Sequence, residues 1–124
     1  MKFQKTSFFI GIADLAANAL ICVLSKDEEK RFLTYEEIES YGNTVVGILN
    51  NQNEKAVLVL SRAHTNQMLH NYSDFFEEQI VEGKRGIKLA EDKTVDDLIE
   101  KFHGYLAFDL LKAFSESYKK WKSA

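Results

Sequence analysis

The sequence predicts a single α/β domain of 124 residues. Three observations support this prediction. Two runs rich in β-branched and aromatic residues occur near the N-terminus, two capping boxes mark helix starts, and the run "AVLVLS" is apolar without alternation. Taken in order, these signals predict strand, strand, strand, helix, central strand, helix, strand, helix in one mixed sheet, followed to the C-terminus by the last helix.

The first three strands are expected to form an antiparallel meander. Residues 6–12 and 19–25 are the two β-rich runs, and "ADLAAN" is the loop expected between them. The polar segment "KDEEK" then predicts a turn that leads into a short third strand at 31–33.

The first helix and the central strand follow this meander. Thr34 and Glu37 have capping-box spacing, so a helix should begin there, with Gly42 allowing close approach to the sheet. It should end in the amide-rich "NNQN". The run at 56–61 is then expected in the middle of the sheet, covered on both faces and paired in parallel.

Two further helices are expected in the second half. One should run from 62 to 80 and stop at the glycines of "EGKRG", and "IKLA" should form a strand. Thr94 and Asp97 repeat the capping spacing and predict a final helix of about 28 residues. Its apolar side chains are Val95, Leu98, Ile99, Phe102, Leu106, Leu110, Ala113, Phe114 and Trp121.

That final helix suggests a contact with another surface. Tyr105, Phe108 and Leu111 lie well off its apolar stripe and broaden it beyond what one sheet face covers. Two explanations are open: the helix is wedged between the sheet and a neighbouring helix, or it forms the seam of a homodimer. We expect a homodimer through this helix.

Composition narrows the class of protein. The net charge is −3, the cations are spread along the chain, and Cys22 is the only cysteine. Scattered cations give little support for a nucleic-acid footprint, and a lone cysteine excludes an intrachain disulfide. No apolar run approaches the roughly 20 residues of a spanning helix. We therefore expect a cytoplasmic protein without membrane contact.

The opening "FFIGIADLAANALICVL" and the predicted order of elements resemble the ribonuclease H-like superfamily, in particular the resolvase-like, DEDD-type transposases. The resemblance covers about the first ninety residues. It implies a mixed sheet with carboxylates that converge on two divalent cations about 4 Å apart. The small size of the chain together with these features also suggests a mobile-element or phage origin.

The carboxylates that this chemistry needs are out of place. Ala13 stands where the family has aspartate, with Asp14 one position later, and Ser61 stands at the second acidic position. The absence of acids at these two positions therefore favours a non-catalytic protein without a metal cofactor. The alternative is a magnesium- or manganese-dependent nuclease that uses Asp14, Asp96 and Asp97, although acids in the first turn of a helix also complement its dipole.

The end of the central strand is the best candidate for a binding site, because ligands bind there in open α/β sheets. The residues are Ser61, Arg62, His64, Thr65 and Asn66. No catalytic residue is assigned. The expected function is that of a small binding or regulatory protein that acts through a protein or small-molecule partner. Nucleotide or other small-molecule capture at the strand end is a further alternative.

Overall fold

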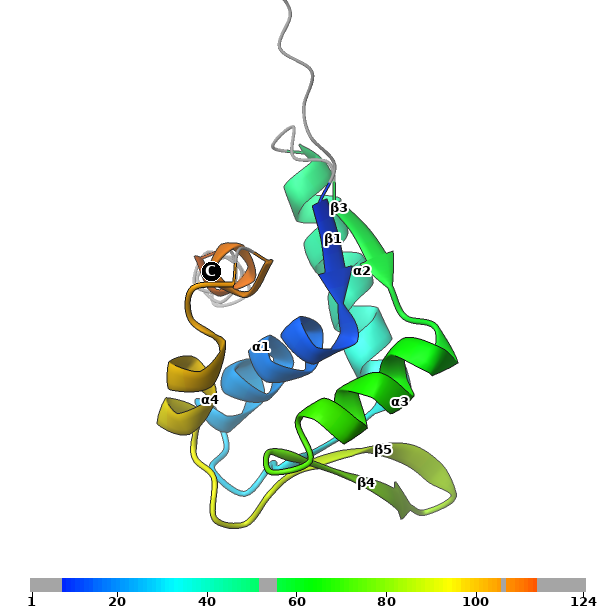
Figure 1. Cartoon of the computed structure of the whole chain (residues 1–124), viewed down its shortest axis with the longest axis vertical. Helices are drawn as coiled ribbons and strands as arrows, with labels where there is room; N and C mark the ends of the chain where they lie inside the picture. Colours follow the sequence, from blue (N-terminus) through cyan, green and yellow to red (C-terminus); the bar gives the residue numbers. More distant parts are fainter. Residues whose placement is uncertain (1–7, 52–55, 106, 114–124) are drawn as a thin grey trace, which may run out of the picture.

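The computed structural model describes residues 8–51, 56–105 and 107–113, and the fold is a mixed α/β one (Figure 1). The elements in chain order are β1 (Phe8–Gly11), α1 (Ile12–Leu24), β2 (Phe32–Thr34), α2 (Tyr35–Asn51), β3 (Ala56–Val59), α3 (Arg62–Asn71), β4 (Phe76–Val81), β5 (Lys84–Leu89) and α4 (Val95–Phe102). Residues 107–113 are also helical.

The described strands form two small sheets, so the expected single mixed sheet is wrong. Strands β1 and β3 pair in parallel, whereas β2, β5 and β4 form an antiparallel sheet with β5 in the middle. Helices α1 and α3 lie between the parallel pair and the antiparallel sheet in Figure 1. The element order also differs from the ribonuclease H-like order expected from the sequence.

The expected second strand at 19–25 is wrong because most of this segment belongs to α1. Alanine and leucine are strong helix formers, and α1 carries both in quantity. A helix buried on most sides shows little amphipathic pattern, which explains why the sequence did not reveal it. Helix α1 contacts α2, α3 and α4 and forms the centre of the core. Its buried residues are Ile12, Leu15, Ala16, Ala17, Asn18, Ala19, Leu20, Ile21 and Leu24.

The predicted start of α2 is confirmed. The Glu37 backbone N–H donates to the Thr34 hydroxyl (3.0 Å), and the Thr34 N–H donates to the Glu37 carboxylate (3.1 Å). Gly42 permits close approach, although to α1 as well as to a strand: a Cβ there would lie 3.0 Å from Leu15 and 3.2 Å from Leu58. The preceding turn and the short strand β2 are also confirmed.

The predicted parallel pairing of β3 is confirmed, but its expected central position is wrong. Among the described strands, β3 has only β1 as a neighbour, and α2 packs against it. No described element covers the other face, where Val57 is 45% exposed and its cross-strand neighbour Phe9 is 66% exposed. An unalternating apolar run therefore does not guarantee burial on both faces.

The expected helix at 62–80 is wrong in its second half. Helix α3 ends at Asn71, and the chain turns before it enters β4. Strand β4 then pairs with β5 in a hairpin whose two-residue turn is Glu82 and Gly83, both with positive φ (53° and 79°). Two positive φ values are typical of a type I′ turn. The glycine thus ends a strand instead of a helix.

The predicted capping box of α4 is confirmed, but the expected long helix is wrong. Helix α4 ends at Phe102, and Gly104 has a φ of +93° that breaks the helix before residues 107–113 resume it. This break turns Phe108 inward, where it is fully buried and stacks on Phe102 at 5.5 Å. Residues 106 and 114–124, which include Phe114 and Trp121 of the expected stripe, lie outside the described part.

The break also changes the argument for a dimer. Phe108 and Leu111 are both fully buried within the chain, so they do not need a second copy to cover them. Tyr105 is the one residue of the three that is exposed. The homodimer stays a prediction. Among the helices that the structure describes, none has the length and apolar character needed to cross a membrane.

Candidate functional site

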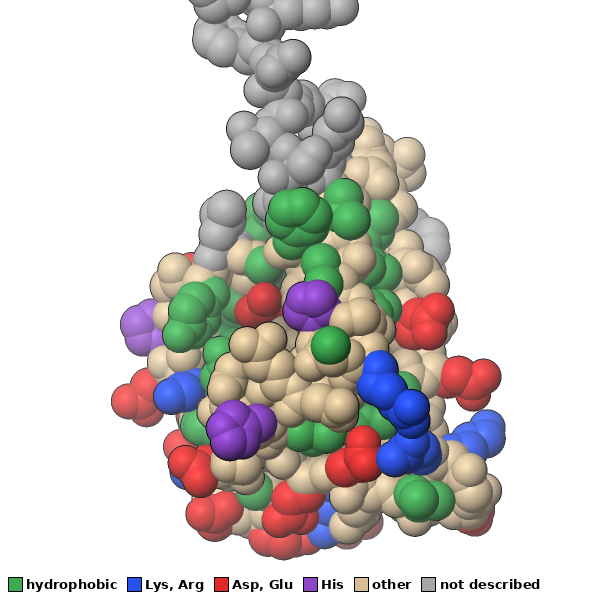
Figure 2. Space-filling view, turned by 45° about the vertical axis from the view of Figure 1, so that its right-hand side comes forward, with side chains coloured by type: hydrophobic (Ala, Val, Ile, Leu, Met, Phe, Trp, Pro, Cys, Tyr) green, Lys and Arg blue, Asp and Glu red, His purple; other side chains and the backbone are tan. Residues whose placement is uncertain are grey.

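Helix α3 is the most exposed described helix and the one with the most polar surface. Only Met68 is fully buried among its ten residues, and none of the ten is acidic. Figure 2 shows α3 across the front of the molecule, with two histidines and neighbouring polar side chains on its open side. Each of α1, α2 and α4 carries at least one acid in its first turn. Helix α3 is therefore suited to a partner that is negative or rich in hydrogen-bonding groups.

The first turn of α3 is fixed by three of the residues selected from the sequence. The Ser61 hydroxyl accepts a hydrogen bond from the His64 backbone N–H (3.3 Å) and also contacts His64 Nδ1. The Thr65 hydroxyl donates to the Ser61 carbonyl (3.2 Å). A side-chain oxygen at this position satisfies an otherwise free backbone donor. Ser61 and Thr65 therefore have structural roles, and His64 is held close to Ser61.

The remaining polar residues of α3 form two neighbouring stripes. Successive residues on a helix are rotated by about 100°, so Arg62, Asn66 and His70 follow one another along its open side. We call them the outer stripe. His64, Gln67 and Asn71 follow a second line, which we call the inner stripe. Gln67 lies at the boundary between the two.

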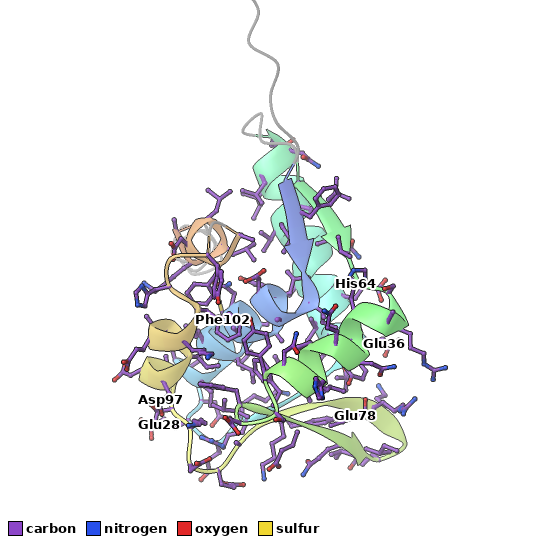
Figure 3. All side chains as sticks on the ribbon, in the orientation of Figure 1. Glu28, Glu36, His64, Glu78, Asp97 and Phe102 are labelled. Atoms are coloured by element: carbon purple, nitrogen blue, oxygen red, sulfur yellow. The ribbon has the colours of Figure 1, made fainter. Side chains whose placement is uncertain are left out.

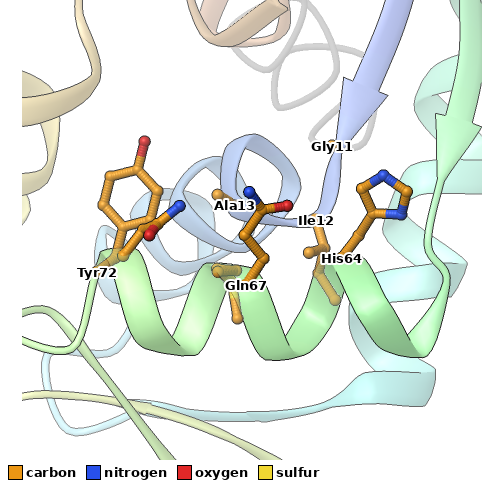
Figure 4. Close-up of a pocket in the computed structure, with 8 residues that line it drawn as sticks. Gly11, Ile12, Ala13, His64, Gln67 and Tyr72 are labelled. Atoms are coloured by element: carbon orange, nitrogen blue, oxygen red, sulfur yellow. The ribbon is translucent and has the colours of Figure 1, made fainter.

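The inner stripe borders a hollow of about 160 Å³ between α3 and the junction of β1 with α1. Figure 4 shows the side chains of His64, Gln67 and Tyr72 on the side of α3 that faces this junction, where Ile12 and Ala13 lie. The full lining is Gly11, Ile12, Ala13, His64, Gln67, Met68, Asn71 and Tyr72. The small side chain of Ala13 therefore lines this hollow.

The β4–β5 hairpin lies along the opposite side of α3 in Figure 1, with its turn at the same end of the molecule as the start of α3. Lys84 and Arg85 follow the turn and are exposed. The nearby acid Glu78 pairs with Arg85 (3.3 Å) and accepts a hydrogen bond from the Tyr35 hydroxyl (2.7 Å). Burial, followed by the contact with Glu78, raises the pKa of Tyr35, so this hydroxyl stays protonated.

The acids considered for metal binding do not form a cluster. Among the described residues, no three His, Cys, Asp or Glu side chains are grouped so that they could hold a metal ion. Asp14 lies in the first turn of α1, where burial raises its pKa. Asp97 accepts hydrogen bonds from Thr94, which lower its pKa. Figure 3 shows Asp97 on α4 and His64 on α3, at opposite sides of the molecule.

The structure thus separates the five predicted site residues into three groups. Ser61 and Thr65 build the helix start, Arg62 and Asn66 belong to the outer stripe, and His64 lines the hollow. Sequence reasoning missed Gln67, His70 and Asn71. The available signal was the stretch "RAHTNQMLHN", which has several amide and imidazole side chains and no acid.

Comparisons of the chain with protein-family models, with curated proteins and with solved structures gave no match.

Proposed function

We propose that the chain is a DNA-binding module that places α3 in the major groove and the β4–β5 hairpin beside it on the backbone. The observation that supports this proposal is an exposed, acid-free helix next to a β-hairpin. The cations of this hairpin lie at the same end of the molecule as the start of α3. The arrangement is of the winged helix–turn–helix kind, with strand β3 inserted between α2 and α3. The proposal keeps the expectation of a binding protein from the sequence, but the proposed partner is DNA instead of a protein or a small molecule.

The outer stripe has the side chains that read base edges. Arginine pairs with the two acceptors of guanine in the major groove, and asparagine or glutamine pairs with adenine. Arg62 and Asn66 of the outer stripe supply these groups about one turn apart, and Gln67 of the inner stripe supplies a further amide beside them. The groove, about 12 Å wide, admits an α-helix. In this arrangement, Arg62 and Asn66 contact bases, and His70 extends the same line of contacts.

The hairpin supplies contacts to phosphates. Lys84 and Arg85 are exposed at the start of β5, next to the hairpin turn, where they pair with Val81 and Ile80 of β4. Phosphate contacts fix the register of a protein on DNA, whereas base contacts specify sequence. The hairpin is therefore expected to determine how strongly the module binds, and α3 to determine where it binds.

The net charge of −3 does not oppose this proposal, because charge acts locally. At physiological salt, charges separated by more than about 8 Å are largely screened. Acids on α4, which lies on the other side of the molecule from the hairpin turn in Figure 1, are thus weakly felt at the surface formed by α3 and the hairpin. Glu78 on β4 is paired with Arg85, so this pair adds little net charge, and Lys84 is the cation beside the turn that carries the proposed phosphate contact.

The proposal is tested by selecting bound sequences from a random duplex pool and measuring affinity by fluorescence anisotropy. Arg62→Ala should weaken binding to the selected duplex by about tenfold to a hundredfold, which corresponds to about 1–3 kcal/mol for one lost base contact. Lys101→Ala, which removes a cation from α4, is the matched control and should leave affinity nearly unchanged.

Two results would reject the proposal. One is the absence of measurable DNA binding at low salt, where phosphate contacts are strongest. The other is an equal loss of affinity in Arg62→Ala and Lys101→Ala. In the same assay, magnesium- or manganese-dependent cleavage that Asp14→Asn abolishes would instead favour the nuclease alternative.

A further inference from the structure

The hollow beside the inner stripe of α3 is not used by the proposed DNA contacts. It is a shallow surface hollow between two elements distant in sequence, the β1–α1 junction and α3 (Figure 4). The small residues Gly11 and Ala13 leave this space open on the junction side. A space lined by residues of an exposed helix offers a site through which a second ligand can act on that helix.

The volume of the hollow corresponds to about one ring in contact with its lining. Its volume is about 160 Å³. An apolar protein cavity of about 150 Å³ accommodates one benzene molecule, whereas sites for drug-sized ligands are about 300 Å³ or larger. A monocyclic planar molecule with small substituents therefore fills the hollow, whereas the sugar of a nucleoside would extend beyond its lining.

The lining defines the chemistry of this ring. Ile12, Ala13 and Met68 provide an apolar surface, and Tyr72 adds an aromatic ring. The side-chain amides of Gln67 and Asn71 have no hydrogen-bond partner among the described residues. Each amide offers both donors and an acceptor. These groups suit a planar ring whose edge alternates N–H and C=O.

Charge at the hollow favours a neutral ligand. None of the eight lining residues is Lys, Arg, Asp or Glu. An acid, Asp14, lies beside the lining: its carboxylate is 3.9 Å from where a Cβ on Gly11 would be. A phosphate or carboxylate on the ligand would approach this acid without a cation in the lining to offset the repulsion.

We propose that the hollow binds a neutral monocyclic heterocycle of the pyrimidine-base class and that this ligand changes the affinity of α3 for DNA. The second half rests on the proposed function. Gln67 links the two halves because it borders both stripes. When its amide bonds a ring in the hollow, it is no longer free to contact a base edge. Ligand and DNA therefore compete for the same side chain.

The first experiment measures ligand binding without DNA. Uracil is titrated into the full chain, and amide chemical shifts are followed by NMR. We expect saturable shifts at Ala13, Gln67 and Asn71. Uridine monophosphate should bind at least tenfold more weakly, because its phosphate approaches Asp14 without a cation in the lining. Absence of saturable shifts with uracil, or equal binding of the phosphate, would overturn the proposal.

Two variants locate the site. Ala13→Leu fills the hollow and should weaken uracil binding at least tenfold, whereas Ala63→Leu makes the same change on the open side of α3 and should not. Since a leucine at position 13 can disturb the fold, Gln67→Met provides a second variant that keeps the side-chain length and removes the amide. Retained binding in Gln67→Met and in a folded Ala13→Leu would reject this site.

The second experiment adds uracil to the complex of the wild-type chain with its selected duplex. DNA affinity should fall several-fold at saturating uracil and should not change in Gln67→Met. Uracil binding without any effect on DNA affinity would overturn the regulatory half. If the chain binds no DNA, the proposed function fails, and the NMR titration still decides the ligand site independently.

Discussion

Gly86 is the position where the antiparallel sheet has no room for a side chain. A Cβ on this residue would lie 2.1 Å from the carbonyl oxygen of Leu33 and 2.7 Å from the Cα of Thr34. Both atoms belong to the backbone, so neither can rotate away. Strand β2 must therefore separate from β5 if any other residue occupies position 86.

Gly86→Ala should lower the free energy of unfolding by about 1–3 kcal/mol or more, as expected for overpacking against an unyielding surface. Gly47→Ala is the matched control: a Cβ there meets nothing within 4 Å, and alanine is favoured over glycine in a helix by about 1 kcal/mol. Urea denaturation of both variants measures the difference. A Gly86→Ala protein as stable as the wild type would contradict the observed pairing of β2 with β5.

Asp14 should make the fold less stable as the pH rises. Burial raises its pKa, and the hydrogen bond from the Gly11 backbone opposes this effect only in part. The folded state thus holds the proton more tightly than the unfolded state does, so stability falls as the pH rises from the unfolded-state pKa through the folded-state pKa.

Asp14→Asn should consequently be more stable than the wild type at pH 7, by less than about 1 kcal/mol because solvent screens a partly exposed carboxyl. The gain should disappear near pH 3, where both proteins are neutral at this position. Asp96→Asn is the control and should lose stability, since an acid in the first turn of α4 complements the helix dipole. Thermal unfolding across pH 3–8 tests both signs.

At the scale of elements, the starts of α2 and α4 could be predicted because a capping box is a local interaction. Thr34 with Glu37, and Thr94 with Asp97, bond within one turn whatever the rest of the chain does. The parallel pairing of β3 could also be inferred from its composition. The number of its neighbours, one among the described strands, could not be inferred, because the number of strands in a sheet depends on residues far away in sequence.

The end of α3 shows why the rest could not be predicted. Tyr72 and Phe76 are spaced as if they continued the apolar side of a helix. In the structure, they pack with Phe102 in one aromatic cluster, with Tyr72 stacked on Phe102 at 4.9 Å. That cluster forms because the chain turns after Asn71. The local signal was the run of turn-forming residues around Ser73 and Asp74.

The candidate site was predictable only in part for the same reason. Arg62 and Asn66 were selected because they follow a strand, which is a property of chain order. Ala13 and His64 come together across the hollow only once α1 replaces the expected loop. A site built between distant elements needs the fold before its residues can be identified.

The break after α4 is an element-scale feature with its own test. Gly104 has a φ of +93°, a value that residues with a Cβ adopt at a cost of about 1–2 kcal/mol. Gly104→Val should therefore destabilise the protein by at least this amount, and Gly104→Asn should cost less because asparagine tolerates positive φ. Equal stability of the two variants in urea would indicate that the residue adopts a different backbone conformation.

At the scale of the whole molecule, the question is whether net charge or local charge governs DNA binding. The chain carries a net charge of −3, and Glu82 lies in the turn of the hairpin beside Lys84. An acid at this place repels the phosphates that the hairpin is proposed to approach. Glu100 is exposed on α4, on the side of the molecule opposite to the hairpin turn in Figure 1.

Glu82→Lys and Glu100→Lys both change the net charge by two units, from −3 to −1. If binding depends on the surface formed by α3 and the hairpin, Glu82→Lys should tighten it about tenfold at 0.1 M salt and make the slope of log affinity against log salt steeper by about 0.9 for the phosphate that it engages. Glu100→Lys should change neither quantity appreciably, because a charge more than about 10 Å away is screened at this salt. Equal gains in the two variants would show that net charge alone attracts DNA, and the surface assigned to α3 and the hairpin would lose its support.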